Sequence, residues 1–187
     1  MITRRFVLAL PVALAHCASP EPAYFTLAAR PGAPLTGGAR LVELRRIGLA
    51  GYLDRPEIVR TSADYRLKLG AGERWGEPLG ALVARVLAED LNTRLPGSSV
   101  FTSSGSISAE PDATIELDLQ RFDADATGQV VLLAQVAVSR GRARAAARTV
   151  RLVVTPTGPS TTDLVAALSM ALAQLADQVA PMLRLGS

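Results

Sequence analysis

The stretch PLGALVARVLAEDLNTRLPG, residues 78–97, repeats apolar side chains at steps of three and four residues. This spacing places the apolar side chains on one face of an α-helix. Pro78 suits the first helical turn, where its missing N–H costs nothing, and Pro96-Gly97 ends the pattern. The apolar face consists of Leu79, Leu82, Val83, Val86, Leu87, Leu91 and Leu95. The stretch therefore predicts a long helix that packs against something apolar.

A second helix is predicted near the C-terminus. Ser160 is followed three residues later by Asp163, which is a capping-box pattern for a helix start. The residues that follow place apolar side chains on one face over about five turns. These side chains are Leu164, Leu168, Leu172, Leu175, Val179 and Met182. The apolar faces of both helices must therefore pack against another apolar surface of the protein.

Strand patterns supply that surface. Residues 112–154 predict an antiparallel meander, because Ile115, Leu117 and Leu119 alternate with polar residues and two further apolar runs follow. Shorter strands are expected at residues 24–27, at 40–49, within 58–69 and after residue 98. We therefore expect an α/β (α+β) sandwich, in which two long helices pack on one face of a mixed, largely antiparallel sheet.

The N-terminus has the layout of a secretory signal peptide. Two arginines within residues 1–5 precede an apolar run at residues 6–15. This run is too short to span a bilayer, which needs about 20 helical residues. We predict a signal peptide at residues 1–16, a tether at residues 17–22 and a single domain at residues 23–187.

Cys17, the sole cysteine, has three possible roles: a buried thiol, a nucleophile or a point of lipid attachment. Leu14-Ala15-His16-Cys17 resembles a bacterial lipobox, although His16 departs from the small residue that usually precedes the cysteine. The Pro-spaced stretch at residues 18–22 is typical of an extended tether and not of a packed element. We therefore predict that Cys17 is lipidated.

The composition excludes several classes of function. His16 is the single histidine, so a chain that begins at Cys17 has neither a Ser-His-Asp triad nor a Cys/His pair nor a His-bound zinc. No P-loop and no dinucleotide fingerprint occurs in the sequence. Glu116 and Asp118 share a strand face, but simple alternation explains them without catalysis. We expect no enzyme activity, no cofactor, no metal site and no nucleic-acid partner.

Trp75, the only tryptophan, leaves two interpretations open: a core side chain or a surface anchor for a partner. It belongs to the last of three segments that stand in order along the chain. They are Tyr24-Phe25-Thr26-Leu27, GYLDRPEIV at residues 51–59 and Arg74-Trp75-Gly76-Glu77-Pro78-Leu79. Behind a lipobox and before a closing apolar helix, these segments resemble the ABC-type transport auxiliary lipoproteins, the paraquat-inducible protein C-like family.

This resemblance implies a non-catalytic periplasmic component of a lipid-transport system built around an Mce (mammalian cell entry) domain protein. The lipoprotein would be anchored on the periplasmic face of the outer membrane and dock onto that Mce-domain protein, with a homo-oligomer possible. The residue after Cys17 is Ala18 and not the Asp that is linked to inner-membrane retention, which favours the outer membrane. The residues implied in partner binding are Tyr52, Asp54, Arg55, Pro56, Arg74, Trp75, Glu77 and Pro78. The alternative is a carrier that holds a lipid between the helices and the sheet.

Overall fold

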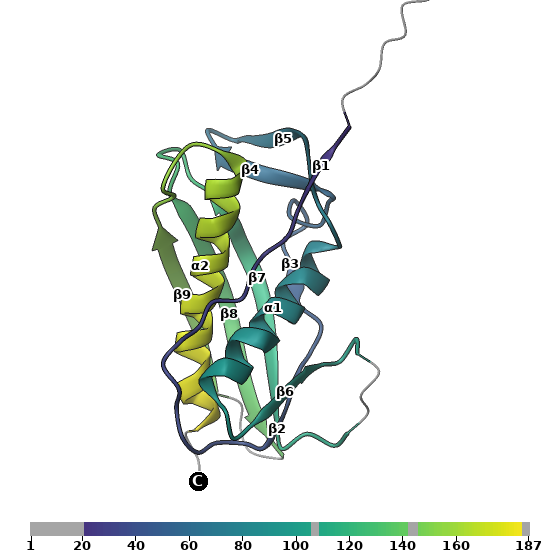
Figure 1. The fold of residues 1–187 in the computed structure, drawn as a ribbon, viewed down its shortest axis with the longest axis vertical. Coiled ribbons are helices and arrows are strands. Elements are labelled where there is room, and N and C mark those ends of the chain that lie inside the picture. The colour runs from purple at the N-terminus through teal and green to yellow at the C-terminus, as the bar shows by residue number, and fades with distance from the viewer. Residues whose placement is uncertain (1–20, 106–108, 142–145, 185–187) are drawn as a thin grey trace, which may run out of the picture.

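The centre of the fold is the predicted meander, formed by β7 (Ala113–Ala124), β8 (Val130–Arg140) and β9 (Ala146–Val154). The computed structural model describes residues 21–105, 109–141 and 146–184, without the side chains of residues 61–63. Both strand pairs are antiparallel, as expected, and one β-bulge interrupts the β7–β8 ladder between Leu119 and Arg121. Figure 1 shows the three strands side by side along the length of the molecule.

Along its other edge, β7 pairs with three successive strands, each of which runs parallel to it. They are β2 (Leu41–Leu44), β3 (Gly48–Leu49) and β4 (Glu57–Ala63). The prediction of a single strand at residues 40–49 is thus wrong, because this segment forms two strands, β2 and β3. The division falls at Arg45 and Arg46, which are both exposed and so break the alternation that a strand requires.

The remaining strands extend the sheet at both ends. β5 (Arg66–Trp75) is antiparallel to β4, and β1 (Ala23–Phe25) lies parallel to the end of β5. β6 (Ser99–Thr102) lies parallel to β2. The sheet is therefore mixed, and its longest ladders are antiparallel, which confirms the expected fold class.

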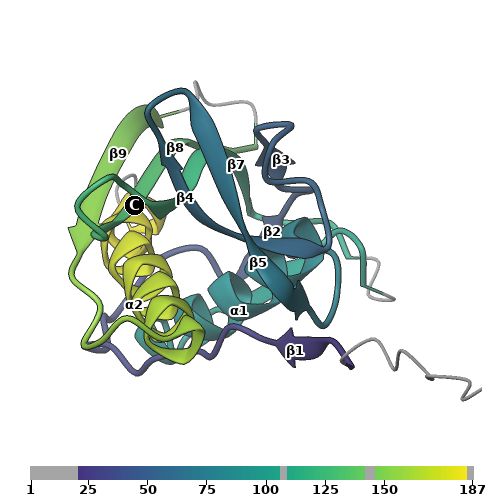
Figure 2. The same cartoon turned by 90° about the horizontal axis from the view of Figure 1, so that it is seen from above.

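Both predicted helices pack on one face of this sheet, where α1 contacts α2 and β6, and α2 contacts β8 and β9 (Figures 1 and 2). α1 spans Leu79–Arg94, and Pro78 caps it with an extended ψ of 129°. Pro78 thus lies one residue before the helical turn in which it was expected. α2 spans Thr161–Val179 and continues into a short 3-10 helix, η1 (Ala180–Leu183). The expected Ser160–Asp163 capping box is present.

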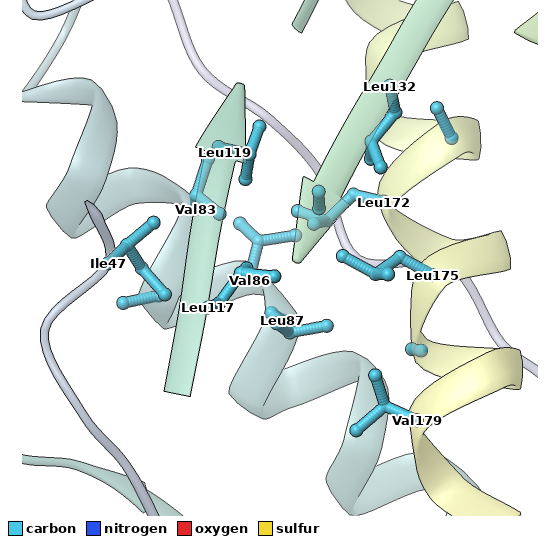
Figure 3. Close-up of a cluster of buried hydrophobic side chains, with 14 of the residues drawn as sticks. Ile47, Val83, Val86, Leu87, Leu117, Leu119, Leu132, Leu172, Leu175 and Val179 are labelled. Carbon is cyan, nitrogen blue, oxygen red and sulfur yellow. The ribbon is translucent and has the colours of Figure 1, made fainter. Parts of the chain in front are cut away.

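The apolar faces of the helices and of the sheet form one core. Leu87 of α1, Leu119 of β7 and Leu172 of α2 are all fully buried in it, and Figure 3 shows them pointing toward one another. The segment Thr161–Leu183 is long and apolar enough to cross a membrane, with a hydropathy of 1.3. However, 67% of that window is buried inside the fold. This burial is that of a core helix.

Candidate functional site

The three segments that carry the family resemblance meet in space, although they are separated in the sequence. We call them together the motif cluster: Tyr24–Leu27, residues 51–59 and Arg74–Leu79. The Gly76 N–H donates to the Phe25 carbonyl (2.8 Å), and the Trp75 N–H donates to the Pro56 carbonyl (2.8 Å). Backbone hydrogen bonds from the end of β5 therefore join all three segments.

One row of side chains in the motif cluster faces solvent. Tyr24 of β1 is in register with Arg74 of β5, which is in register with Glu57 of β4. Residues in register on neighbouring strands share a face of the sheet. Tyr24 is 63% exposed, Arg74 is exposed and Glu57 is half-buried. We call these three residues the outer row.

Trp75 faces the opposite way from the outer row. It is 5% exposed and belongs to the hydrophobic core, and Phe25, its register partner in β1, packs against the same core. Successive side chains of a strand point to opposite faces, so the burial of Trp75 accompanies the exposure of Arg74. Of the two interpretations left open for Trp75, the structure favours the core side chain.

Glu77 and Pro78 connect the motif cluster to the start of α1. Arg85 of α1 donates to the Glu77 carboxylate (2.7 Å) and to the Thr26 hydroxyl (3.4 Å). The Pro78 carbonyl accepts the N–H groups of Ala81 (2.9 Å) and Leu82 (3.0 Å). Thus Arg85 ties α1 to Glu77 and to the residue that follows β1, and Pro78 begins the helix.

Tyr52 lies against the bulge of β7. Its hydroxyl donates to the Gln120 carbonyl (3.5 Å), and burial raises the pKa of Tyr52, with a further contribution from the nearby Asp123 carboxylate. Asp123 is fully buried and accepts a hydrogen bond from Arg121 (2.9 Å). Half-buried and held in this way, Tyr52 fixes the second segment of the motif cluster to the central strand.

The other predicted residues of the second segment lie nearer the surface. Asp54 and Pro56 are exposed and Arg55 is half-buried. Asp54 and Pro78 both line a surface groove of about 690 Å³ between the start of α1 and the segment that joins β2 to β3. Arg45 and Arg46 lie on the far side of the same groove. The structure thus brings an exposed carboxylate and two arginines to one hollow.

A second hollow, of about 990 Å³, lies on the sheet face that the helices leave open. Its polar lining includes Arg45, Glu116, Asp118 and Gln135. Glu116 forms an ion pair with Arg45, which connects β7 to the segment after β2. This pairing agrees with the interpretation of Glu116 as a solvated residue of an alternating strand.

The sequence analysis missed two buried charges on α1, Asp90 and Arg94, which together with the exposed Asp177 of α2 we call the buried charge cluster. Arg94 is 2% exposed and donates to the Asp177 carboxylate (2.6 Å) and to the carbonyls of Arg30, Asp90 and Ala173 (each 3.0 Å). The signal that could have revealed it is the pair of opposite charges at positions i and i+4 inside an apolar helical pattern.

The same cluster holds the loop that precedes β2. The Arg30 N–H donates to the Asp90 carboxylate (2.7 Å), and the Leu35 N–H donates to the Arg94 carbonyl (2.7 Å). A Cβ at Gly32 would overlap the Arg94 guanidinium, so the loop can pass this close only with glycine. Burial raises the pKa of Asp90 to about 6, although the Arg30 N–H and Arg94 act in the opposite direction.

Cys17, the predicted lipid-attachment residue, lies outside the described residues, as do the signal peptide and most of the tether. Within the described residues, no group of three or more His, Cys, Asp or Glu side chains is placed to hold a metal ion.

Comparison with known families identifies the chain. The sequence model of the ABC-type transport auxiliary lipoprotein component matches residues 25–180. This match includes nearly all of the motif cluster and both helices. The chain belongs to that family of lipoproteins, whose members serve ABC-type transporters and are anchored in the bacterial envelope. A search of curated proteins found no match.

Solved structures share the fold. The crystal structure of an uncharacterized protein is 21% identical, with 87% of this chain and 99% of that chain covered and a TM-score of 0.72. A protein from Xanthomonas campestris is 17% identical over 83% of this chain and 91% of its own, with a TM-score of 0.64. A PelC variant from Paraburkholderia phytofirmans, solved as a dodecamer, is 12% identical over 81% and 94%, with a TM-score of 0.47.

Proposed function

We propose that this chain is the outer-membrane auxiliary component of an Mce-type ABC system that moves lipid across the envelope. Cys17 anchors it after removal of the signal peptide, and the folded domain docks onto the periplasmic Mce-domain protein. The chain performs no catalysis in this scheme. Its task is to hold the partner at the membrane that bears the anchor.

The observation that supports docking is the solvent-facing half of the motif cluster. Trp75 serves the core and Tyr52 serves β7, so packing accounts for both. Arg74 and Asp54 are exposed, and neither contributes to the core. Exposed arginine and tyrosine side chains are frequent in protein interfaces, where arginine also provides directed hydrogen bonds to carboxylates. We therefore assign docking to the outer row and to the groove beside Asp54.

The alternative function, a lipid carrier, has less support. Such a carrier was expected to hold its ligand between the helices and the sheet. The side chains at that boundary, including Leu87, Leu119 and Leu172, are fully buried in one continuous core (Figure 3). The large hollow on the open sheet face is lined by charged side chains such as Glu116 and Arg45. That hollow lies on the other side of the sheet from the helices, so it is not the site that this alternative predicts.

Co-purification from membranes tests the docking proposal. The lipidated protein is isolated under conditions that preserve envelope complexes, and the amount of any co-purified Mce-domain protein is measured in the eluate. Arg74→Glu and Asp54→Arg each reverse an exposed charge of the motif cluster, and each should strongly reduce the recovered partner. Mispaired charge at an interface costs several kcal/mol because like charges are brought together.

Arg151→Glu is the matched control, because Arg151 is an exposed arginine on β9, outside the motif cluster. It should leave the recovered partner unchanged. Equal recovery with all three variants would refute docking through the motif cluster. Stoichiometric lipid in the gently purified protein, without any Mce-domain protein, would favour the carrier instead.

A further inference from the structure

The hairpin of β4 and β5 carries apolar side chains that the described chain leaves partly or fully exposed. Leu67 and Leu69 of β5 are 42% and 40% exposed, and Tyr65 at the turn is fully exposed. Arg66 and Lys68 alternate with them and are exposed as well. One short segment therefore presents an aromatic ring, two leucines and two cations to the surroundings.

The turn of this hairpin does not require an aromatic residue. Asp64 and Tyr65 form a two-residue connection between the paired residues Ala63 and Arg66, with φ values of 51° and 60°. Glycine or asparagine is preferred at such positions, since a side chain in the left-handed region is strained. Tyr65 thus occupies its position against the conformational preference of the turn, and packing against the described residues does not explain it.

The hairpin projects from a firmly held base. Arg60 of β4 donates to the Pro159 carbonyl (2.7 Å) and to the Thr161 hydroxyl at the start of α2. It also forms an ion pair with Glu73 of β5 (3.3 Å), and the Thr161 hydroxyl donates to the same carboxylate. These contacts tie both strands to the helix, so the exposed turn is presented in a fixed direction.

The hairpin crosses the end of the molecule at which β1 begins, as Figures 1 and 2 show from two directions. Five residues lie between Cys17 and Ala23, the first residue of β1, so six residue-to-residue steps connect the two. Fully extended, they span only about 20 Å, at roughly 3.3–3.6 Å per residue. An acylated Cys17 would therefore keep the membrane close to this end of the domain.

We propose that the β4–β5 hairpin contacts the lipid surface into which the anchor inserts. The inference rests on the anchor of the proposed function. Tyrosine favours the headgroup level of a bilayer, and leucines bury area at the boundary of the acyl chains. Arg66 and Lys68 attract anionic headgroups, and Asp64 is the one acid at the turn. A second contact of this kind fixes the orientation of the domain relative to the membrane, whereas a tether alone leaves that orientation free.

Fluorescence quenching in vesicles tests the contact. The full acylated protein is reconstituted in phosphatidylethanolamine and phosphatidylglycerol vesicles, with and without brominated acyl chains. Tyr65→Trp places an indole at the turn, while the buried Trp75 gives a constant background that the unsubstituted protein reports. The added indole should lose most of its emission to the brominated lipid and shift its emission to shorter wavelength. Leu67→Trp provides a second probe in case the turn does not accept the larger ring.

Met170→Trp is the matched control, because Met170 is an apolar residue of α2 that is also 40% exposed. Its added emission should be unaffected by brominated lipid. Unquenched probes at positions 65 and 67 in acylated protein would overturn the hairpin contact and leave the anchor intact. A shift that follows protein concentration without quenching would overturn it too, by showing that protein covers the hairpin. The intact mass of the same sample shows whether Cys17 is acylated. An unacylated Cys17 would overturn both the proposed anchor and the hairpin contact.

Discussion

The motif cluster and the buried charge cluster are both rich in arginine and carboxylate, but they use these groups in opposite ways. Arg74 of the motif cluster is exposed, and the side chains of the Arg85–Glu77 pair are 51% and 36% exposed. Arg94 of the buried charge cluster is 2% exposed and has partners on both helices and on the loop before β2.

This difference separates residues that hold the fold from residues that are free to bind. An exposed ion pair contributes about 0–1 kcal/mol, because water screens it. A buried charge that loses its partner costs about 3–5 kcal/mol, because the remaining charge stays desolvated. The segments that stand out in the sequence are thus not where the ionic contribution to stability is concentrated. Substitutions in the two clusters should have clearly different effects.

Arg94→Ala should produce the largest effect. It leaves the fully buried Asp90 carboxylate without its neighbouring cation and removes the donor to three carbonyls. We expect the free energy of unfolding in urea to fall by about 3–5 kcal/mol. Arg85→Ala, which removes an exposed arginine from the same helix, should cost no more than about 1 kcal/mol. Equal losses in the two variants would contradict the distinction between the clusters.

Local patterns predicted the elements well. The two helices, the Ser160–Asp163 capping box and the β7–β8–β9 meander follow from periodicity and from turns between neighbours in sequence. Each of these features depends on residues close together in the chain. The division of residues 40–49 into β2 and β3 was missed, because pairing with β7 takes place about 70 residues further on.

The candidate site could be predicted only in part. The resemblance indicated the three segments, but not that β5 would join β1 and β4 and thereby divide their side chains between core and solvent. That division decides the role of Trp75. The buried charge cluster escaped prediction because a charged residue within an apolar helix is usually assigned to the wet face. The contacts with α2 and the loop folded over Arg94 place it inside, and both are distant in sequence.

The pH dependence of stability gives a smaller test of the buried charge cluster. The pKa of Asp90 is raised to about 6 in the folded protein, chiefly by burial. Between its ordinary pKa of 3.8 and about 6, the folded state therefore binds a proton more tightly than the unfolded state. The stability that Asp90 contributes should be complete below that range and decline as the pH rises through it.

Urea unfolding of the wild type and of Asp90→Asn across that range measures this contribution, because asparagine does not titrate. As the pH rises, the free energy of unfolding of the wild type should fall relative to that of Asp90→Asn. Parallel curves for the two proteins would show that Asp90 does not couple folding to protonation. The other neighbouring charges, Glu89, Arg94 and Asp177, are common to both proteins and leave the comparison intact.

Arg74→Ala should have the smallest effect on stability, and it separates a docking role from a structural role for this residue. The guanidinium of Arg74 is exposed in the outer row, so its removal should change the free energy of unfolding by no more than about 0.5 kcal/mol. The same variant should recover less of the Mce-domain protein from membranes than the wild type does. Loss of partner with unchanged stability would assign Arg74 to docking. A loss of stability above about 1 kcal/mol would instead mean that the side chain holds β1, β4 and β5 together. The three segments would then resemble the family because they build its fold, and the docking surface would have to lie elsewhere.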